Sequence, residues 1–68
     1  MSKVVKVIEV LSQSSKSWED AAQKAVKEAS KSIKNIKSIY IKDHSAKVVD
    51  DKIVKYRITA KISFVIEQ

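Results

Sequence analysis

The chain has 68 residues and a formal net charge of +6 at pH 7, and it contains no cysteine, glycine or proline. The absence of cysteine excludes a disulfide framework, a thiol nucleophile and a thiolate metal site. The single histidine, His44, has no second histidine with which to form a zinc site. The lysines are spread along the whole chain, which favours a solvated surface over a dedicated patch for nucleic acid or membranes.

The length predicts one domain spanning residues 1–68. A chain this short buries only about 60% of the surface that its unfolded form exposes, so small folds without disulfides or metals commonly rely on oligomerisation. The opening MSKVVKVIEV has no uninterrupted apolar run of signal-peptide length, and no later stretch approaches the roughly 20 apolar residues of a membrane span. We therefore expect a cytoplasmic protein that contacts no membrane.

Residues 3–11, KVVKVIEVL, are rich in valine and predict a strand. Both faces of this strand are partly apolar: Val5, Val7 and Leu11 share one face with Glu9, and Val4, Ile8 and Val10 share the other with Lys6. The pattern predicts a strand that is covered on both sides, once by its own helix and once by a neighbour.

Serines at positions 12, 14, 15 and 17 predict a loop, and Ser17 followed by Asp20 predicts a helix start with a capping box. The stripe of the amphipathic helix consists of Ala22, Val26, Ala29 and Ile33. Lys31 and Lys34 are expected in its last turns, and Asn35 is expected to end it in a left-handed conformation. Trp18, the first helical residue, is interpreted as a packing anchor.

The remainder alternates with the period of a strand, from KNIKSIYIKD at residues 34–43 to the regular apolar and polar pattern of residues 56–66. Asp50-Asp51 is the expected two-residue turn, and paired residues then sum to 101. The expected pairs are Ile39 with Ile62, Ile41 with Ala60, Ser38 with Ser63, Tyr40 with Lys61, Lys42 with Thr59 and His44 with Arg57. This register places Ser45 and Lys47 on the apolar face, so a bulge is expected near residues 44–47.

The fold class is therefore α+β in the order β-α-β-β, with a three-stranded antiparallel sheet and one amphipathic helix packed on one face. The other face is left for solvent, a ligand or other subunits. Its expected side chains are Tyr40, Arg57, Thr59 and Lys61.

Three stretches of the chain, KVVKVIE at 3–9, SWEDA at 17–21 and the closing strand at 56–67, resemble the dodecin family. The resemblance covers essentially the whole chain without gaps. It implies a hollow, roughly spherical homododecamer that binds FMN, other flavins or related nucleotides. Some members bind coenzyme A, and the family is regarded as storing or sequestering its ligands and not as enzymes.

The resemblance also carries over ligand positions, two of which are altered here. The position of the tryptophan that stacks on the flavin between two subunits falls at Ser38, and that of a hydrogen-bonding glutamine falls at Arg57. Serine offers no stacking surface, which predicts weakened flavin binding and resembles the subgroup for which calcium binding has been proposed, the calcium dodecins. The resemblance further implies phosphate contacts from Lys6, Ser32 and Lys34.

The residues themselves assign no calcium site, because Asp50 and Asp51 are explained as a turn. They also provide no Cys–His pair, no Ser–His–Asp spacing and no glycine-rich phosphate loop, so the chain is not expected to be an enzyme. One alternative is a small basic module that binds nucleic acid through the sheet face, although such platforms usually present two or three aromatic residues. Another is a structural shell that holds no ligand.

Overall fold

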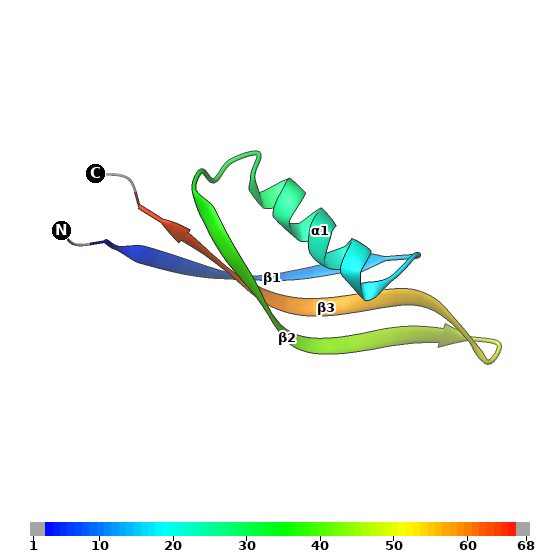
Figure 1. Ribbon diagram of the computed structural model, residues 1–68. Coiled ribbons are helices and arrows are strands. Elements are labelled where there is room, and N and C mark those ends of the chain that lie inside the picture. The colour runs from blue at the N-terminus through cyan, green and yellow to red at the C-terminus, as the bar shows by residue number, and fades with distance from the viewer. Residues whose placement is uncertain (1–2, 67–68) are drawn as a thin grey trace.

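The computed structural model describes residues 3–66, which form the order strand, helix, strand, strand (Figure 1). The elements are β1 (Val5–Ser14), α1 (Trp18–Ala29), β2 (Ile36–Val49) and β3 (Lys52–Val65). All strand pairs are antiparallel, and β3 lies in the centre of the sheet between β1 and β2. The predicted fold class is confirmed.

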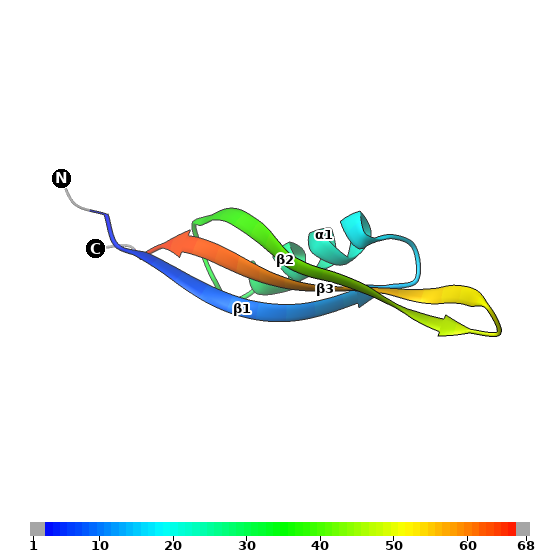
Figure 2. The same cartoon turned by 90° about the horizontal axis from the view of Figure 1, so that it is seen from below.

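The molecule is long and thin, because the β2–β3 hairpin continues past the start of α1 as an uncovered arm (Figures 1 and 2). The chain measures 54 × 20 × 13 Å and has a radius of gyration of 14.1 Å. A compact domain of this length has a radius of gyration of about 11 Å. The chain exposes 5331 Å² of surface, whereas a compact monomer of its mass exposes roughly 4,300 Å².

The first strand extends beyond its predicted end at residue 11. β1 runs to Ser14, and the loop that follows it consists of residues 15–17. Serine can continue this strand because the start of α1 supplies hydrogen-bond partners above it. Ser12 donates to the carbonyl of Ala21 at 2.8 Å, and Ser14 donates to the carboxylate of Asp20. The seam between strand and helix is therefore polar at this end.

The helix begins where expected and ends early. Ser17 is the N-cap and accepts from the Asp20 amide at 2.9 Å, but the Asp20 side chain bonds Ser14 and does not complete a capping box. The helix ends at Ala29 with Ser30 as C-cap, so the prediction that Lys31 and Lys34 occupy its last turns is wrong. Ser30 donates to the Lys27 carbonyl, a local bond through which serine competes with helix continuation.

Asn35 does adopt the expected left-handed conformation, with φ of 64°, but it lies beyond the helix and leads directly into β2. Its carbonyl accepts from the amide of Val65 at 3.2 Å. The left-handed residue therefore starts the second strand and does not end the helix.

The turn between β2 and β3 is Asp50-Asp51 as predicted, with φ values of 52° and 66°. Positive φ at both central residues is the backbone of a two-residue hairpin turn whose twist matches the strands. The register sum of 101 is confirmed next to this turn, where Val48 pairs with Ile53.

The same register holds near the other end of the hairpin, where Ile39 pairs with Ile62, Ile41 with Ala60, Ser38 with Ser63 and Tyr40 with Lys61. Between these segments the register is shifted by one, because a bulge between Ile41 and Asp43 is offset by an irregularity between Lys47 and Val48. The predicted pairs of Lys42 with Thr59 and His44 with Arg57 are therefore wrong. Asp43 faces Thr59 and His44 faces Ile58.

The bulge begins two residues earlier than expected. It exchanges the two faces of β2 for the residues that follow it. Opposed residues lie on the same face of a sheet. Ser45 and Lys47 therefore leave the apolar side, and His44 enters it. The imidazole of His44 lies 5.8 Å from the ring of Trp18, which also meets Tyr56 edge-on at 4.9 Å and donates from Nε1 to the Ser45 carbonyl at 2.9 Å. Trp18 is confirmed as a packing anchor.

The core lies between α1 and the centre of the sheet and is small. Its buried apolar residues are Ala21, Ala25, Ile58, Ala60 and Ile62. Two alanines on the helix allow it to approach β3 closely, and the half-buried Val10, Ile39 and Ile41 complete the layer. At 12 residues, the helix in the described part of the chain is too short to cross a membrane.

Candidate ligand-binding face

The sheet has one face that α1 does not cover, here called the helix-free face. Its side chains include Val5, Val7, Glu9, Leu11 and Gln13 of β1, Arg57, Thr59, Lys61 and Ser63 of β3, and Ser38, Tyr40, Asp43 and Ser45 of β2. Its β1 portion is apolar and exposed, since Leu11 is 82% exposed. Its β2 and β3 portions are polar, so the predicted polar face is present with an apolar margin.

Ser38 lies near the start of β2 on this face, and its hydroxyl shares a hydrogen bond with that of Ser63 on the neighbouring strand. The two hydroxyls bond to each other and present no ring to a ligand. A planar aromatic ligand at this position would contact a small polar surface and would have no ring on which to stack.

Arg57 lies on the central strand between Gln13 of β1 and Ser45 of β2. Its Nε donates to the side-chain oxygen of Gln13 at 3.3 Å, which leaves the remaining guanidinium donors available on an exposed surface. Arginine can donate in pairs to an anion or stack on a planar group, but it has no acceptor.

Ser38 and Arg57 share a face and do not meet within one protomer. Ser38 pairs with Ser63, which is six residues from Arg57 along β3. At about 3.4 Å per residue the two positions are roughly 20 Å apart. A single ring system that touches both positions must therefore be shared between two copies of the chain.

The middle of the face carries Tyr40 beside Lys61, with Glu9 on the far strand. Tyr40 is 65% exposed, and it is the one aromatic side chain that the described strands place on this face. Lys42, the extra residue of the bulge, reaches across the central strand to the carboxylate of Glu9 at 3.3 Å. The bulge therefore adds a cation to the centre of the face.

The three residues expected to contact phosphate lie in two neighbouring places. Ser32 and Lys34 line a cavity of about 250 Å³ with Phe64, at the turn between α1 and β2. Lys6 is the cross-strand partner of Phe64 and is exposed. All three residues thus lie around one aromatic residue of β3, although Lys6 does not itself line the cavity.

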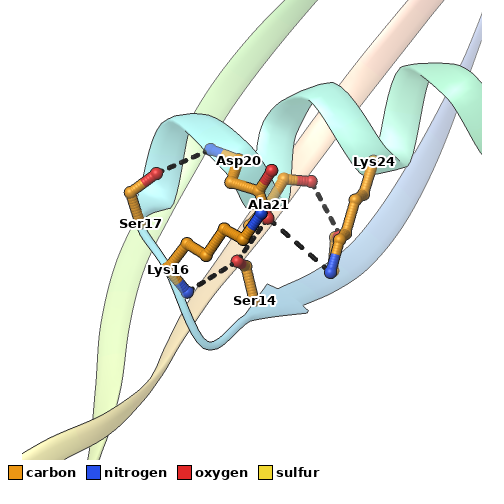
Figure 3. A network of polar contacts seen from close by, with 7 residues as sticks. Ser14, Lys16, Ser17, Asp20, Ala21 and Lys24 are labelled. Atoms are coloured by element: carbon orange, nitrogen blue, oxygen red, sulfur yellow. Dashed lines mark hydrogen bonds and ion pairs between the residues drawn. The ribbon is translucent and has the colours of Figure 1, made fainter.

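A polar network at the start of the helix was missed by the sequence analysis (Figure 3). Ser14, 2% exposed, donates to Asp20 at 2.5 Å and accepts from the Lys16 amide at 2.9 Å. The Ser14 hydroxyl is the main cause that lowers the pKa of Asp20, partial burial opposes it, and the charges of Lys24 and Lys16 assist. A serine in a predicted loop carries no sequence signal for such a contact, because the partner is set by how the helix docks.

Residues 3–66 contain no group of three or more histidine, cysteine or acidic side chains able to hold a metal ion. Asp50 and Asp51 form the turn at the end of the β2–β3 hairpin.

The fold and its open face define a small β-α-β-β protein with one covered and one uncovered sheet surface. The sequence model of the family described as Dodecin matches residues 4–67. The chain belongs to the dodecin family, and the resemblance noted in the sequence is confirmed. It is accordingly a small binding protein of dodecin type.

Solved structures agree with this family. A dodecin variant from Thermus thermophilus superposes with a TM-score of 0.93 at 22% identity, covering 98% of this chain and 100% of the other. Dodecin from Streptomyces coelicolor gives 0.91 at 20% identity, with 97% and 94% covered.

A third structure is that of calcium dodecin from Mycobacterium tuberculosis, described as a calcium-chelating immunodominant antigen. It is 33% identical, with a TM-score of 0.81 and coverage of 94% of this chain and 91% of the other. No curated protein matches the chain in sequence.

Proposed function

We propose that the chain assembles into a hollow homododecamer that binds and sequesters a small molecule, and that it holds flavin more weakly than family members with the stacking tryptophan. The protein acts by binding and not by catalysis. Its site is the helix-free face, shared between copies.

The observation that carries the assembly is the surface that one protomer leaves uncovered. The chain exposes 5331 Å², about 1,000 Å² more than the compact monomer expected for its mass. Much of the exposed apolar surface is grouped, with Val5, Val7 and Leu11 on the helix-free face and further residues on the arm. Exposed apolar patches of this kind commonly mark protein contacts, so association with further copies would supply the burial that the small core lacks.

The weakened flavin affinity follows from the chemistry at Ser38. Its hydroxyl bonds Ser63 and provides no stacking surface. Loss of stacking is worth about 1–3 kcal/mol per ring by analogy with base stacking, or roughly a 5- to 150-fold change in dissociation constant. Arg57 would add charge-assisted donors from a second copy, which favours a ligand that carries an anionic group.

Coenzyme A is a second ligand to test, because Lys6, Ser32 and Lys34 surround Phe64 near one cavity. Lysines there would hold phosphates as point charges. Calcium is the third. It is prompted by the resemblance at Ser38 to the calcium dodecins and by the Mycobacterium relative, whereas the described residues of this chain supply no cluster of ligands.

A nucleic-acid platform is less well supported than a small-ligand site. The helix-free face presents Tyr40 as its aromatic residue, with Lys42, Lys61 and Arg57 nearby. Single-strand platforms stack successive bases on several rings. A gel shift that is abolished by moderate salt would favour the nucleic-acid alternative, because phosphate contacts weaken steeply with ionic strength.

Native mass spectrometry of protein purified without added ligand tests the assembly. Twelve subunits with a small-molecule adduct would support the proposal and give the mass of the ligand. Twelve subunits without an adduct would favour an empty shell and direct titrations of FMN, coenzyme A and calcium. A monomer at every concentration would refute the proposal.

Titration of FMN by fluorescence quenching tests the ligand face. Ser38→Trp is expected to tighten binding by roughly tenfold or more, because it restores the stacking surface. Ser15→Trp is the matched control, since it adds the same ring to the exposed loop before the helix. Equal affinities for Ser38→Trp and the control would show that the ligand face is misplaced.

A further inference from the structure

A groove lies between the helix and the first strand, on the face of the sheet that α1 covers (Figure 1). This α1–β1 groove has a volume of about 730 Å³, which falls within the roughly 300–1,000 Å³ of protein ligand sites. Its apolar lining includes Ile8, Val10, Ala25, Ala29 and Ile33. All of these except Ala25 are only half-buried, so an apolar group in the groove would remove further surface from water.

The rim of the groove is basic. Lys24, Lys27 and Lys31 line it together with one acidic residue, Glu28. Lys24 pairs with Asp20 at 3.6 Å and Lys31 pairs with Glu28 at 3.2 Å, whereas Lys27 makes no ion pair with any described residue. Exposed pairs of this kind are weak, so an anion at the rim would meet one free ammonium group and two that are easily redirected.

Apolar lining and basic rim together select an occupant with one aliphatic end and one anionic end. A second copy of the chain is disfavoured, because the chain carries a net charge of +6 and its uncovered hairpin arm presents Lys47, Lys52 and Lys55. A nucleic acid would meet the lysines but has no aliphatic part for the lining. The lysines are exposed and the apolar lining is half-buried or buried, so a single chain reaches that lining and a flat membrane surface does not.

We infer that the α1–β1 groove binds a free single-chain fatty carboxylate, with its carboxylate at Lys27 and its aliphatic chain along Ile8 and Ile33. Lysine holds a carboxylate as a point charge on a flexible stem, which suits a headgroup at an open rim. The groove shares neither Ser38 nor Arg57 with the ligand positions on the helix-free face. The inference therefore goes beyond the proposed function and does not depend on it.

A series of ligands is the first test, measured by isothermal titration calorimetry on the original protein, with each ligand below its micelle concentration. Affinity should rise from octanoate to decanoate by about two- to fourfold for each added methylene, because each one buries further apolar surface. Decyltrimethylammonium carries a chain of the same length with the opposite charge, and it should bind at least about tenfold more weakly than decanoate. Equal affinity for the two head groups would overturn the inference.

Filling the groove is the second test. Ala29→Phe places a ring in the groove, and Ser30→Phe places the same ring one residue later, at an exposed position that does not line it. Ala29→Phe should weaken decanoate binding by about tenfold or more, because an added ring displaces the chain. Ser30→Phe should remain within about threefold of the original protein, since a surface change away from a contact has little effect.

Charge reversal at the rim is the third test, and it applies even if circular dichroism shows that Ala29→Phe does not fold. Lys27→Glu should weaken decanoate binding by about fivefold or more, because it replaces an attraction with a repulsion. Lys37→Glu makes the same change of net charge outside the groove and should weaken binding by less than about twofold, since exposed charges at a distance are screened.

The outcomes separate this site from the proposed function. Unchanged decanoate binding by folded Ala29→Phe, or equal weakening by the two glutamate variants, would overturn the groove site. Binding of phosphatidylglycerol vesicles without binding of free decanoate would also overturn it, in favour of a membrane surface. FMN affinity should be the same in Ala29→Phe as in the original protein, and competition between FMN and decanoate would show that the groove is not a separate site. Failure of FMN to bind at all would count against the proposed function, whereas decanoate binding with the expected variant effects would still support the groove site.

Discussion

Ser14 joins the end of β1 to the start of α1, and its replacement by alanine tests how this seam is held. The side chain is 2% exposed, and its hydroxyl both donates to Asp20 and accepts from the Lys16 amide (Figure 3). Removing a buried serine hydroxyl with its hydrogen bonds should lower the free energy of unfolding at pH 7 by about 1–3 kcal/mol.

The effect should depend on pH because the bond from Ser14 to Asp20 is stronger when Asp20 is ionised than when it is protonated. The Ser14 hydroxyl is the largest cause that lowers the pKa of Asp20 in the folded protein. A lowered pKa contributes stability that is complete above the unfolded value of about 4 and is lost as the pH falls through the folded value. Ser14→Ala returns the pKa of Asp20 toward its ordinary value. The difference in free energy of unfolding between the original protein and Ser14→Ala, here called the stability gap, should therefore narrow from pH 7 to pH 3.

Urea unfolding followed by Trp18 fluorescence, at one protein concentration and at pH 7, 5 and 3, measures this gap. Ser12→Ala is the matched control, because Ser12 lies on the same strand and donates to the uncharged carbonyl of Ala21. The stability gap between the original protein and Ser12→Ala should not change with pH. A gap for Ser14→Ala that stays constant, or that narrows only as much as the control, would refute the reasoning.

Three further changes test the rest of the fold by the same unfolding assay. Ile62→Ala should cost about 2–5 kcal/mol because the side chain is fully buried in the centre of the sheet, and an equal cost for Thr59→Ala on the helix-free face would contradict this. Ser17→Ala should cost about 1 kcal/mol through loss of the N-cap, and Ser17→Asp should retain most of that stability; equal losses would exclude a capping role. Lys42→Met should change stability by less than about 1 kcal/mol because its ion pair with Glu9 is exposed, and a larger loss would mean that the pair stabilises the bulge.

The alternation of apolar residues predicted the sheet, and the two turn residues predicted its register. Ile39 faces Ile62 and Ile41 faces Ala60 as expected, because a hairpin turn and a buried face both constrain pairing to one alignment. The sequence also signalled a bulge, since Ser45 and Lys47 would otherwise lie on the apolar side. It could not locate the bulge, because an extra residue at any of several positions before Ser45 returns Ser45 and Lys47 to the polar side.

The candidate face was predicted in composition and only partly in arrangement. Ser38 and Arg57 lie on it as expected. Their separation of roughly 20 Å along β3 follows from the pairing of Ser38 with Ser63, which the register predicted, and from the strand rise. His44 was expected on this face and lies on the other, beside Trp18.

The sequence by itself determined the order of elements, the pairing of β2 with β3, the helix start at Ser17 and the family of the protein, because these depend on local periodicity, turn chemistry and whole-chain resemblance. Tertiary structure decided where the helix ends, how Ser14 and Asp20 meet, which face receives His44, and that an arm and a groove are left uncovered. These features depend on how α1 docks on a twisted sheet, and docking is set by contacts between residues distant in the chain.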